Sequence, residues 1–300
     1  MKCAVIDIGS NSMRLTGYDA QKTEFRILFK EKVMAGLAGY VEGNTLTPEG
    51  ISRACDGLLE FRKTLDALEL NQVYVFATAS LRNVDNTLQA VEEIRDSTGF
   101  SVKVLTGEEE ALYGYQGAMM DLNMTDGVFV DIGGASTEMV TFSHGALAQA
   151  ASIPVGSLKL YRDCVKKLLP SQSALEQMSR LLDRALESRR EFDRATASNL
   201  ACVGGTARAV LKLARSRFHL PRQQRDFTVE QLDDLCQFLF RADRSAIDLI
   251  LKTEPERIHT LIPGMMILQK LAHRWKAGQL VVSQYGVREG YLCQEVQSRM

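Results

Sequence analysis

Several features that mark specialised classes of protein are scarce or missing in this sequence. Charge of one sign is not in excess, because 36 basic residues face 37 acidic ones and the formal net charge is -1. A nearly neutral chain has no overall field to attract nucleic acid or an anionic membrane. No segment reaches the ~20 uninterrupted apolar residues that a membrane span needs. We therefore expect no nucleic acid and no membrane as partner, and any polyanion would have to be bound locally.

Metal-binding and disulfide patterns are missing as well. The six cysteines are scattered through apolar segments without a closely spaced pair, which favours reduced core residues. The four histidines are dispersed and none lies near a glycine-rich segment, so histidine-based catalysis is not expected. The chain starts on a strand-like segment in place of a charged leader and apolar block. From these absences we expect a cytoplasmic protein.

What the sequence does contain is one pattern that occurs twice. Residues 4–12 read AVIDIGSNS and residues 128–138 read VFVDIGGASTE. Each has an apolar, β-branched run, an Asp-Ile-Gly and a small polar tail, which is typical of a strand feeding a tight turn that can approach phosphate. The repeat predicts two similar halves, each offering a phosphate-binding turn to a shared cleft.

Apolar periodicity predicts an α/β organisation throughout the 300 residues. In the first half we expect strands at 3–8, 13–18, 24–33, 72–79 and 102–105, and helices from Pro48, at 88–95 and at 108–120. The helix from Pro48 has a Thr47 cap and an expected buried face of Ile51, Ala54, Leu58, Phe61, Leu65 and Leu68.

The second half repeats the alternation of strands and helices. We expect strands at 128–132, 138–142, 147–154, 200–203 and 280–283, and helices at 158–169, 174–192, 207–216, between 228 and 275, and at 288–297. Thr228 to Gln231 fits a capping box. The polar stretch 121–126 is the expected boundary, which gives domains 1–124 and 125–287, with the last helix, 288–300, returning to the first domain.

Six segments in this order resemble the exopolyphosphatase/guanosine pentaphosphatase (Ppx/GppA) family. They are 6–12, 77–82, 105–111, 131–138, 204–206 and 283–290. The resemblance covers nearly the whole chain. It implies two actin-like, ribonuclease H-like domains of the sugar kinase, Hsp70 and actin superfamily, with a cleft between them.

Hydrolysis of a terminal phosphoanhydride needs donors that hold the phosphate. The candidate donors are Ser10, Asn11 and Ser12 in the first turn, Gly133, Gly134, Ser136 and Thr137 in the second, and Gly204, Gly205 and Thr206 at a helix start. Arg82, in the expected polar loop 80–86, could clamp phosphate oxygens. The alternatives are sharp strand corners, an ordinary strand-helix turn and a surface arginine without a role.

Carboxylates at strand and helix ends are the candidates for metal and water. Asp7 and Asp131 could hold Mg²⁺, or each could cap its own turn. The resemblance assigns the metal to Asp131 more firmly than to Asp7. It also selects Glu110 as the base that positions the nucleophilic water, whereas an acidic first turn alone indicates only helix capping. Glu138 is the second carboxylate, for metal or water, unless it is an outward strand residue.

The resemblance therefore implies a Mg²⁺-dependent hydrolase that releases terminal phosphate from inorganic polyphosphate, from guanosine pentaphosphate (pppGpp), or from both. Met34 and Ala135 stand where the family usually has an arginine and a third glycine. They motivate an alternative, a catalytically weak alarmone- or nucleotide-binding protein. A small-molecule kinase of the same superfamily is the other alternative, and a homodimer is left open.

Overall fold

The computed structural model describes residues 1–193, 195 and 197–299, so Met300, the last residue of the expected closing segment, lies outside the described residues. Packing divides the chain into two units, one of Met1–Tyr113 with the residues from Arg288 on, the other of Gly114–Val287. The units part inside a helix, earlier in the chain than the expected limit at 124/125. The domain limits named from the sequence stay a prediction.

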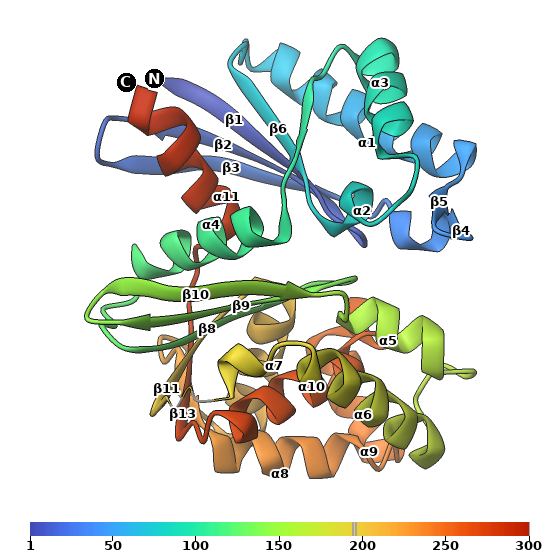
Figure 1. The fold of residues 1–300 in the computed structure, drawn as a ribbon, viewed down its shortest axis with the longest axis vertical. Helices are drawn as coiled ribbons and strands as arrows, with labels where there is room; N and C mark the ends of the chain where they lie inside the picture. Colours follow the sequence, from blue (N-terminus) through green and yellow to red (C-terminus); the bar gives the residue numbers. More distant parts are fainter. Residues whose placement is uncertain (194, 196, 300) are drawn as a thin grey trace. The chain divides into compact units, whose positions relative to one another are not determined.

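The first unit is built on a five-stranded sheet in the order β3-β2-β1-β6-β7 (Figure 1). Its strands are β1 (Lys2–Ile8), β2 (Met13–Ala20), β3 (Phe25–Val33), β6 (Val73–Ala77) and β7 (Val102–Val104), and β4 (Val41–Glu42) pairs separately with β5 (Thr45–Leu46). The first three strands are antiparallel neighbours, and β6 runs parallel to β1 and β7. All five expected strands are present in this sheet.

Helices cover both faces of this sheet, as the apolar residues on both sides of β6 predict. On one face, Val75 and Ala77 join the core beneath α1 (Pro48–Ala67) and α3 (Thr87–Thr98). On the other, the Phe76 ring lies 4.8 Å from the Tyr291 ring of α11 (Val287–Tyr291). The remaining helices are α2 (Ala79–Arg82), α4 (Gly107–Met119) and the 3-10 turn η1 (Leu37–Tyr40).

Local signals explain most of the first unit, and two expectations were wrong. The Thr47 side chain accepts a hydrogen bond from the Gly50 amide at 3.2 Å, which starts α1 as expected. Leu68 is 51% exposed, because α1 ends at Ala67 and Leu68 no longer follows the helical face. The expected polar loop after β6 begins with the short helix α2, in which Ser80 and Leu81 are buried.

The closing segment of the chain belongs to the first unit, and buried and partly buried polar contacts hold it there. It continues from α11 into a π-helical turn, Leu292–Val296, where an ordinary helix was expected. Tyr18 donates a hydrogen bond to the buried Glu289 at 2.9 Å. Lys103 and Tyr113 both donate to Glu295, at 2.9 and 2.7 Å. These contacts join residues far apart in sequence, so no local pattern predicts them.

The second unit has a six-stranded sheet in the order β10-β9-β8-β11-β13-β12. The strands are β8 (Gly127–Ile132), β9 (Thr137–Ser143), β10 (Ala146–Ile153), β11 (Asn199–Val203), β12 (Asp226–Thr228) and β13 (Gln279–Val282). Figure 1 shows the helices of this unit grouped below the β8–β10 hairpins. They are α5 (Ser157–Cys164), α6 (Gln172–Glu187), α7 (Gly204–Phe218), α8 (Val229–Leu239), α9 (Arg244–Thr253), α10 (Leu261–Arg274) and the turns η2 (Arg190–Phe192) and η3 (Pro255–Arg257).

Three helix boundaries and one strand in the second unit differ from the sequence expectation. The helix expected at 174–192 ends at Glu187. The helix expected at 158–169 ends at Cys164, because Val165 is extended. The helix expected from 207 begins at Gly204, so the glycine pair lies in its first turn. Strand β12 was not expected, and its three residues pair antiparallel with β13. The Thr228–Gln231 capping box is present as predicted.

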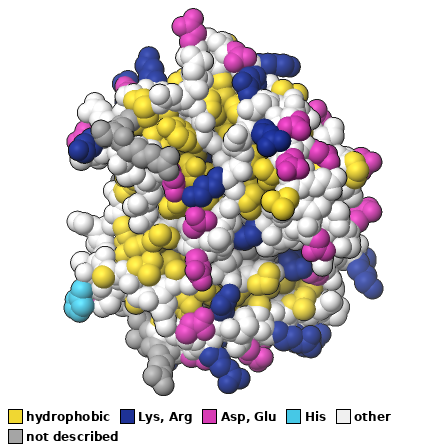
Figure 2. All heavy atoms as spheres, turned by 45° about the horizontal axis from the view of Figure 1, so that its top comes forward, with side chains coloured by type: hydrophobic (Ala, Val, Ile, Leu, Met, Phe, Trp, Pro, Cys, Tyr) yellow, Lys and Arg dark blue, Asp and Glu magenta, His cyan; other side chains and the backbone are white. Residues whose placement is uncertain are grey.

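The surface shows the charge balance of the composition. On the face drawn in Figure 2, acidic and basic side chains are interspersed among apolar ones, without a continuous area of one sign. Among the described residues, no helix combines the length and apolarity that crossing a membrane would require.

Replacing Gly290 by alanine should loosen the closing segment. A β-carbon there would lie 1.9 Å from the Tyr113 carbonyl oxygen, and a backbone atom cannot swing away as a flexible side chain could. We expect G290A to lower the free energy of unfolding by about 1–3 kcal/mol or more, as overpacking does. Urea unfolding followed by circular dichroism measures this. The control is G39A, where nothing lies within 4 Å of the added methyl; equal stability of the two variants would contradict the prediction.

Candidate functional site

The turn after β1 is fixed by backbone contacts to the segment before η1. The Ser10 carbonyl accepts from the Ala38 amide at 2.9 Å, and the Asn11 carbonyl accepts from the Gly36 amide at 3.0 Å. A β-carbon on Gly9 would lie 2.9 Å from the Ser12 carbonyl oxygen, so the close turn requires glycine. Ser10 is buried, whereas Asn11 and Ser12 are half-buried. The turn is therefore preorganised with its polar residues partly accessible.

Asp7 precedes this turn and has arginines as neighbours. Burial raises the pKa of its carboxyl, while Arg288 and Arg14 act in the opposite direction and Glu289 adds to the rise. Arg14 stands directly opposite Asp7 in the β1–β2 pairing, and Arg288 donates to the Thr16 hydroxyl at 2.8 Å. Positive side chains thus already offset part of the cost of this carboxylate.

The structure separates the three consecutive acids of α4 by their surroundings. Glu108 is exposed. Glu109 accepts from the Thr106 amide at 2.9 Å, and its own amide donates to the Thr106 hydroxyl, so it caps the helix. Although burial acts to raise the pKa of Glu109, hydrogen bonds from Thr106 and Lys103 outweigh it and lower the pKa. Glu110 is 8% exposed and is the acid turned into the unit.

Arg82 lies beside Glu110 and is not a surface arginine. Its Nη1 lies 2.7 Å from Glu110 Oε2 and donates to the Leu105 carbonyl at 3.1 Å, with the side chain 17% exposed. α2 brings Arg82 to this position, and the Ser80 hydroxyl at its start donates to the Ile8 carbonyl. Glu110, the candidate base, and Arg82, the candidate phosphate-binding arginine, come from separate segments and are therefore in contact in the first unit.

The turn after β8 is fixed by hydrogen bonds from the start of α5. The Gly133 carbonyl accepts from the Ser157 amide at 2.9 Å and from its hydroxyl at 3.1 Å. The Gly134 carbonyl accepts from two further amides of that helix, both at 2.9 Å. Among the described residues, the amides of Gly134 and Ala135 donate to no protein acceptor. The turn can thus offer them to an anion.

The hydroxyls expected to bind phosphate differ in what they contact. Thr137 donates to the Val155 carbonyl at 2.7 Å, and Thr206 donates to the Ile132 carbonyl at 3.1 Å. Both are buried and bond the backbone beside the turn. Ser136 is also buried, at 3% exposure, and its carbonyl accepts from the Gly133 amide at 3.0 Å. The two threonines therefore shape the turn through their hydroxyl protons.

Asp131 and Glu138 stand directly opposite each other in the antiparallel pairing of β8 and β9. Directly opposed side chains lie on the same face of a sheet, and two like charges there repel. Glu138 is 1% exposed and accepts from the Ser152 hydroxyl at 2.8 Å, so it is not an outward strand residue. The register thus brings together two of the three acids that the sequence analysis offered to a metal, and Asp7 lies in the other unit.

The first residue of α7, Gly204, packs closely against the Asp131 carboxylate. Gly204 has a φ of +81°, and a β-carbon on it would lie 2.2 Å from Asp131 Oδ1. Glycine is required here both for the left-handed backbone and for the approach to the carboxylate. The glycine pair that sequence analysis offered as a phosphate turn is placed against the acid that it offered as a metal ligand.

Arg257 is a residue that sequence reasoning missed. A β-carbon on Gly205 would lie 1.9 Å from its Nη2, so the guanidinium rests against the first turn of α7. Burial lowers the pKa of Arg257. Glu254 acts against this effect without cancelling it, and its Oε2 lies 3.7 Å from Arg257 Nε. The arginine follows α9 in the chain and reaches α7 only through the tertiary fold, so no local pattern signalled it.

The residues of the second unit fit Mg²⁺ by their chemistry, since hard carboxylate oxygens are its usual protein ligands. Among the described residues, no group of three or more histidine, cysteine, aspartate or glutamate side chains is arranged to hold a metal. A cation at Asp131 and Glu138 would therefore complete its coordination with water or phosphate oxygens, as Mg²⁺ commonly does.

Each unit thus combines an α/β sheet, a glycine turn at a strand end and buried acids, as proteins that handle phosphate do. The model of the Ppx/GppA phosphatase family matches residues 18–299, and the chain belongs to this family. The resemblance in the sequence and the α/β fold class are confirmed.

A curated relative and two solved structures are similar to this chain over nearly its full length. Exopolyphosphatase 2 of Mycobacterium tuberculosis is 27% identical, over 96% of this chain and 97% of its own. The Aquifex aeolicus Ppx/GppA family member is 24% identical with a TM-score of 0.80, covering 100% of this chain and 98% of its own. An exopolyphosphatase from Cytophaga hutchinsonii is 21% identical with a TM-score of 0.86, covering 99% and 98%. These structures have the same fold.

Adding a methyl group at Gly156 should displace the second turn. The new β-carbon would lie 2.5 Å from the Gly134 carbonyl carbon and 2.7 Å from the Ala135 amide nitrogen. We expect G156A to reduce phosphate release at least tenfold, since small displacements of a positioning group are costly. Steady-state kinetics with folding checked by circular dichroism tests it. In the matched control, G278A, the nearest atom lies 3.6 Å away; equal losses in both variants would contradict the prediction.

Proposed function

We propose that this protein is a Mg²⁺-dependent phosphoanhydride hydrolase that releases the terminal phosphate of inorganic polyphosphate, of guanosine pentaphosphate, or of both. Family membership supports the phosphatase class. The names of the Mycobacterium tuberculosis and Cytophaga hutchinsonii proteins support polyphosphate as a substrate. The single observation that carries the proposal is the buried Glu110 held at 2.7 Å by Arg82, while its two acidic neighbours are exposed or used in capping.

Glu110 is the proposed general base. A carboxylate that aligns water for in-line attack must be fixed in direction, and the contact with Arg82 supplies that restraint. Arg82 is the proposed clamp for the transferred phosphoryl group, because its guanidinium can also donate to phosphate oxygens. As bond cleavage proceeds, the water proton passes to Glu110 and negative charge builds on the leaving phosphate.

The turns are proposed to hold the phosphate chain. In the second unit, the Gly134 and Ala135 amides would donate to phosphate oxygens, and in the first, Ser10, Asn11 and Ser12 would do the same. Asp131 and Glu138 would hold Mg²⁺, which would supply neutralisation of phosphate charge. A shared cleft, a homodimer and a cytoplasmic location stay predictions from the sequence.

Replacing Glu110 by glutamine should remove the base with little change in shape. We expect E110Q to lower kcat by about 10²–10⁴-fold, the usual contribution of general base catalysis. The measurement is phosphate release from polyphosphate and from guanosine pentaphosphate side by side, each with and without Mg²⁺.

The matched control is E108Q, which makes the same change two residues earlier at an exposed position. It should retain wild-type turnover. Equal activity of E110Q and wild type would reject Glu110 as base. Tight nucleotide binding by the wild type without turnover of either substrate would instead favour the alarmone-binding alternative, and ADP formation dependent on a small-molecule acceptor would favour the kinase.

Mg²⁺ should stabilise the wild-type protein without any substrate. A cation between Asp131 and Glu138 would relieve the repulsion of opposed carboxylates, so we expect the melting temperature to rise by several degrees at saturating Mg²⁺. The rise should shrink in E138Q and in D131N. D163N, a change at an exposed acid of α5, should keep it. A full rise in both site variants would rule out this pair as the metal site.

A further inference from the structure

The segment 283–290 resembles the family pattern, but the reaction proposed above gives it no role. Its residues from Arg288 on belong to the first unit. In the pairing of β1 with β6, Asp7 lies beside Phe76, whose ring packs 4.8 Å from the buried Tyr291 ring. Since neighbouring residues of paired strands share a face of the sheet, α11 covers the face that carries Asp7.

The guanidinium of Arg288 is held at the end of a buried hydrogen-bond chain. Its Nη1 donates to the Thr16 hydroxyl at 2.8 Å, Thr16 also hydrogen-bonds the Tyr18 hydroxyl, and Tyr18 donates to Glu289 at 2.9 Å. Thr16 and Tyr18 are fully buried, and Glu289 is 1% exposed. Members of such a chain polarise one another, which strengthens each bond. Arg288 is thus fixed in direction, while its own side chain is half-buried.

Arg288 lies near the turn after β1, and Asp7 shows this. Burial has the largest effect on the Asp7 pKa and raises it, and among the charged groups Arg288 opposes that rise most. A β-carbon on Gly9 would lie 3.9 Å from Asp7 Oδ1, so the carboxylate lies beside the turn of residues 9–12. The guanidinium therefore stands at the end of the sheet where the candidate phosphate donors of this turn lie.

This fixed guanidinium has donors left for a ligand. An arginine carries five N–H groups, and in the described part of the chain Arg288 donates to Thr16 alone. No carboxylate of that part of the chain forms an ion pair with it. Two of its N–H groups can point in parallel at the oxygens of one phosphate, a geometry that a lysine cannot provide.

We propose that Arg288 is a substrate-binding residue that donates to phosphate oxygens held at the turn of residues 9–12. The hydrogen-bond chain through Thr16, Tyr18 and Glu289 positions it. This inference rests on the proposed function, because it places a phosphate of the substrate at that turn. The closing segment of the chain thereby takes part in substrate binding.

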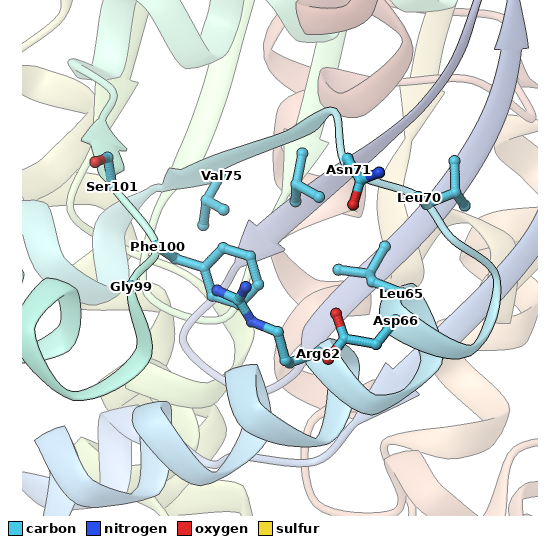
Figure 3. Close-up of a pocket in the computed structure, with 10 residues that line it drawn as sticks. Arg62, Leu65, Asp66, Leu70, Asn71, Val75, Gly99, Phe100 and Ser101 are labelled. Atoms are coloured by element: carbon cyan, nitrogen blue, oxygen red, sulfur yellow. The ribbon is translucent and has the colours of Figure 1, made fainter.

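A second fixed arginine of the same unit provides a matched control. Arg62 donates to the Thr98 carbonyl at 2.7 Å, and its guanidinium carbon lies 4.0 Å from the centre of the Phe100 ring. It lines a cavity of about 310 Å³, shown in Figure 3, together with Val73, the first residue of β6. Because β1 and β6 are parallel, this cavity lies at the opposite end of the sheet from the turn of residues 9–12.

Calorimetric titration of the whole protein with inorganic tripolyphosphate tests the assignment. EDTA is present to prevent the proposed Mg²⁺-dependent turnover. We expect saturable binding by the wild type in the millimolar range or tighter. R288Q should bind at least about tenfold more weakly, the loss expected when charged hydrogen bonds are removed, whereas R62Q should bind like the wild type. No saturable binding by the wild type, or equal affinity of R288Q and R62Q, would overturn the proposal.

A conservative variant keeps the test decisive if R288Q does not fold. R288K retains the positive charge beside Asp7 but cannot make two parallel hydrogen bonds, so it should bind tripolyphosphate about fivefold or more weakly than R62K. Equal affinity of these two lysine variants would also overturn the proposal. Binding that depends on Arg288 in a protein that releases no phosphate would reject the proposed function and leave the assignment of Arg288 intact.

The positioning chain has its own test at Tyr18, which is fully buried and does not reach a ligand. Y18F removes one hydroxyl of the chain and should raise KM for polyphosphate about threefold or more with kcat unchanged, the pattern of lost binding. It should weaken tripolyphosphate binding by a similar factor. Y74F makes the same change at a half-buried position of β6 and should leave both values as in the wild type. Equal KM and affinity in Y18F and Y74F would refute positioning through this chain.

Discussion

The opposition of Asp131 and Glu138 across β8 and β9 is the constraint on which the second unit depends. Two carboxylates on one face of a sheet cost free energy through repulsion and through desolvation, since Glu138 is almost fully buried. The surrounding structure meets this cost in part. Ser152 donates to Glu138, and the missing side chain of Gly204 leaves room for the Asp131 carboxylate. The direct opposition of these two acids supports the proposal that they bind a cation.

In the first unit, the candidate acids lie beside arginine side chains. Burial raises the pKa of Asp7, while Arg288 and Arg14, which lies opposite it across the sheet, act against that rise; Glu110 lies against Arg82. Both acids therefore have arginines as neighbours within the unit, and Arg288 comes from its closing segment. The contact with Arg82 supports the proposal that Glu110 is a restrained carboxylate suited to orienting water.

The sequence predicted those features that depend on local chemistry. Strand patterns, the Thr47 cap and the Thr228 capping box were right because each is decided within a few residues. Leu68 and the loop after β6 were wrong because helix ends depend on packing as well as periodicity. Glu109 caps its helix with Thr106, three residues away, which is a local contact. The contact of Glu110 with Arg82 and the position of Arg257 required the fold, since their partners lie in other elements.

Ala135 stands where the family usually has a third glycine, and the structure shows what this difference does to the turn. A third glycine would be indispensable if the turn needed a left-handed backbone there, but Ala135 is not among the residues with positive φ. The turn is held instead by the Gly133 and Gly134 carbonyls on the start of α5, and by the absence of a side chain at Gly156. Those contacts involve the backbone on either side of the methyl group and do not depend on it. Alanine therefore adds bulk to the turn without altering the conformation that directs its amides, and the proposed binding of phosphate would depend on Gly156 more than on a glycine at position 135.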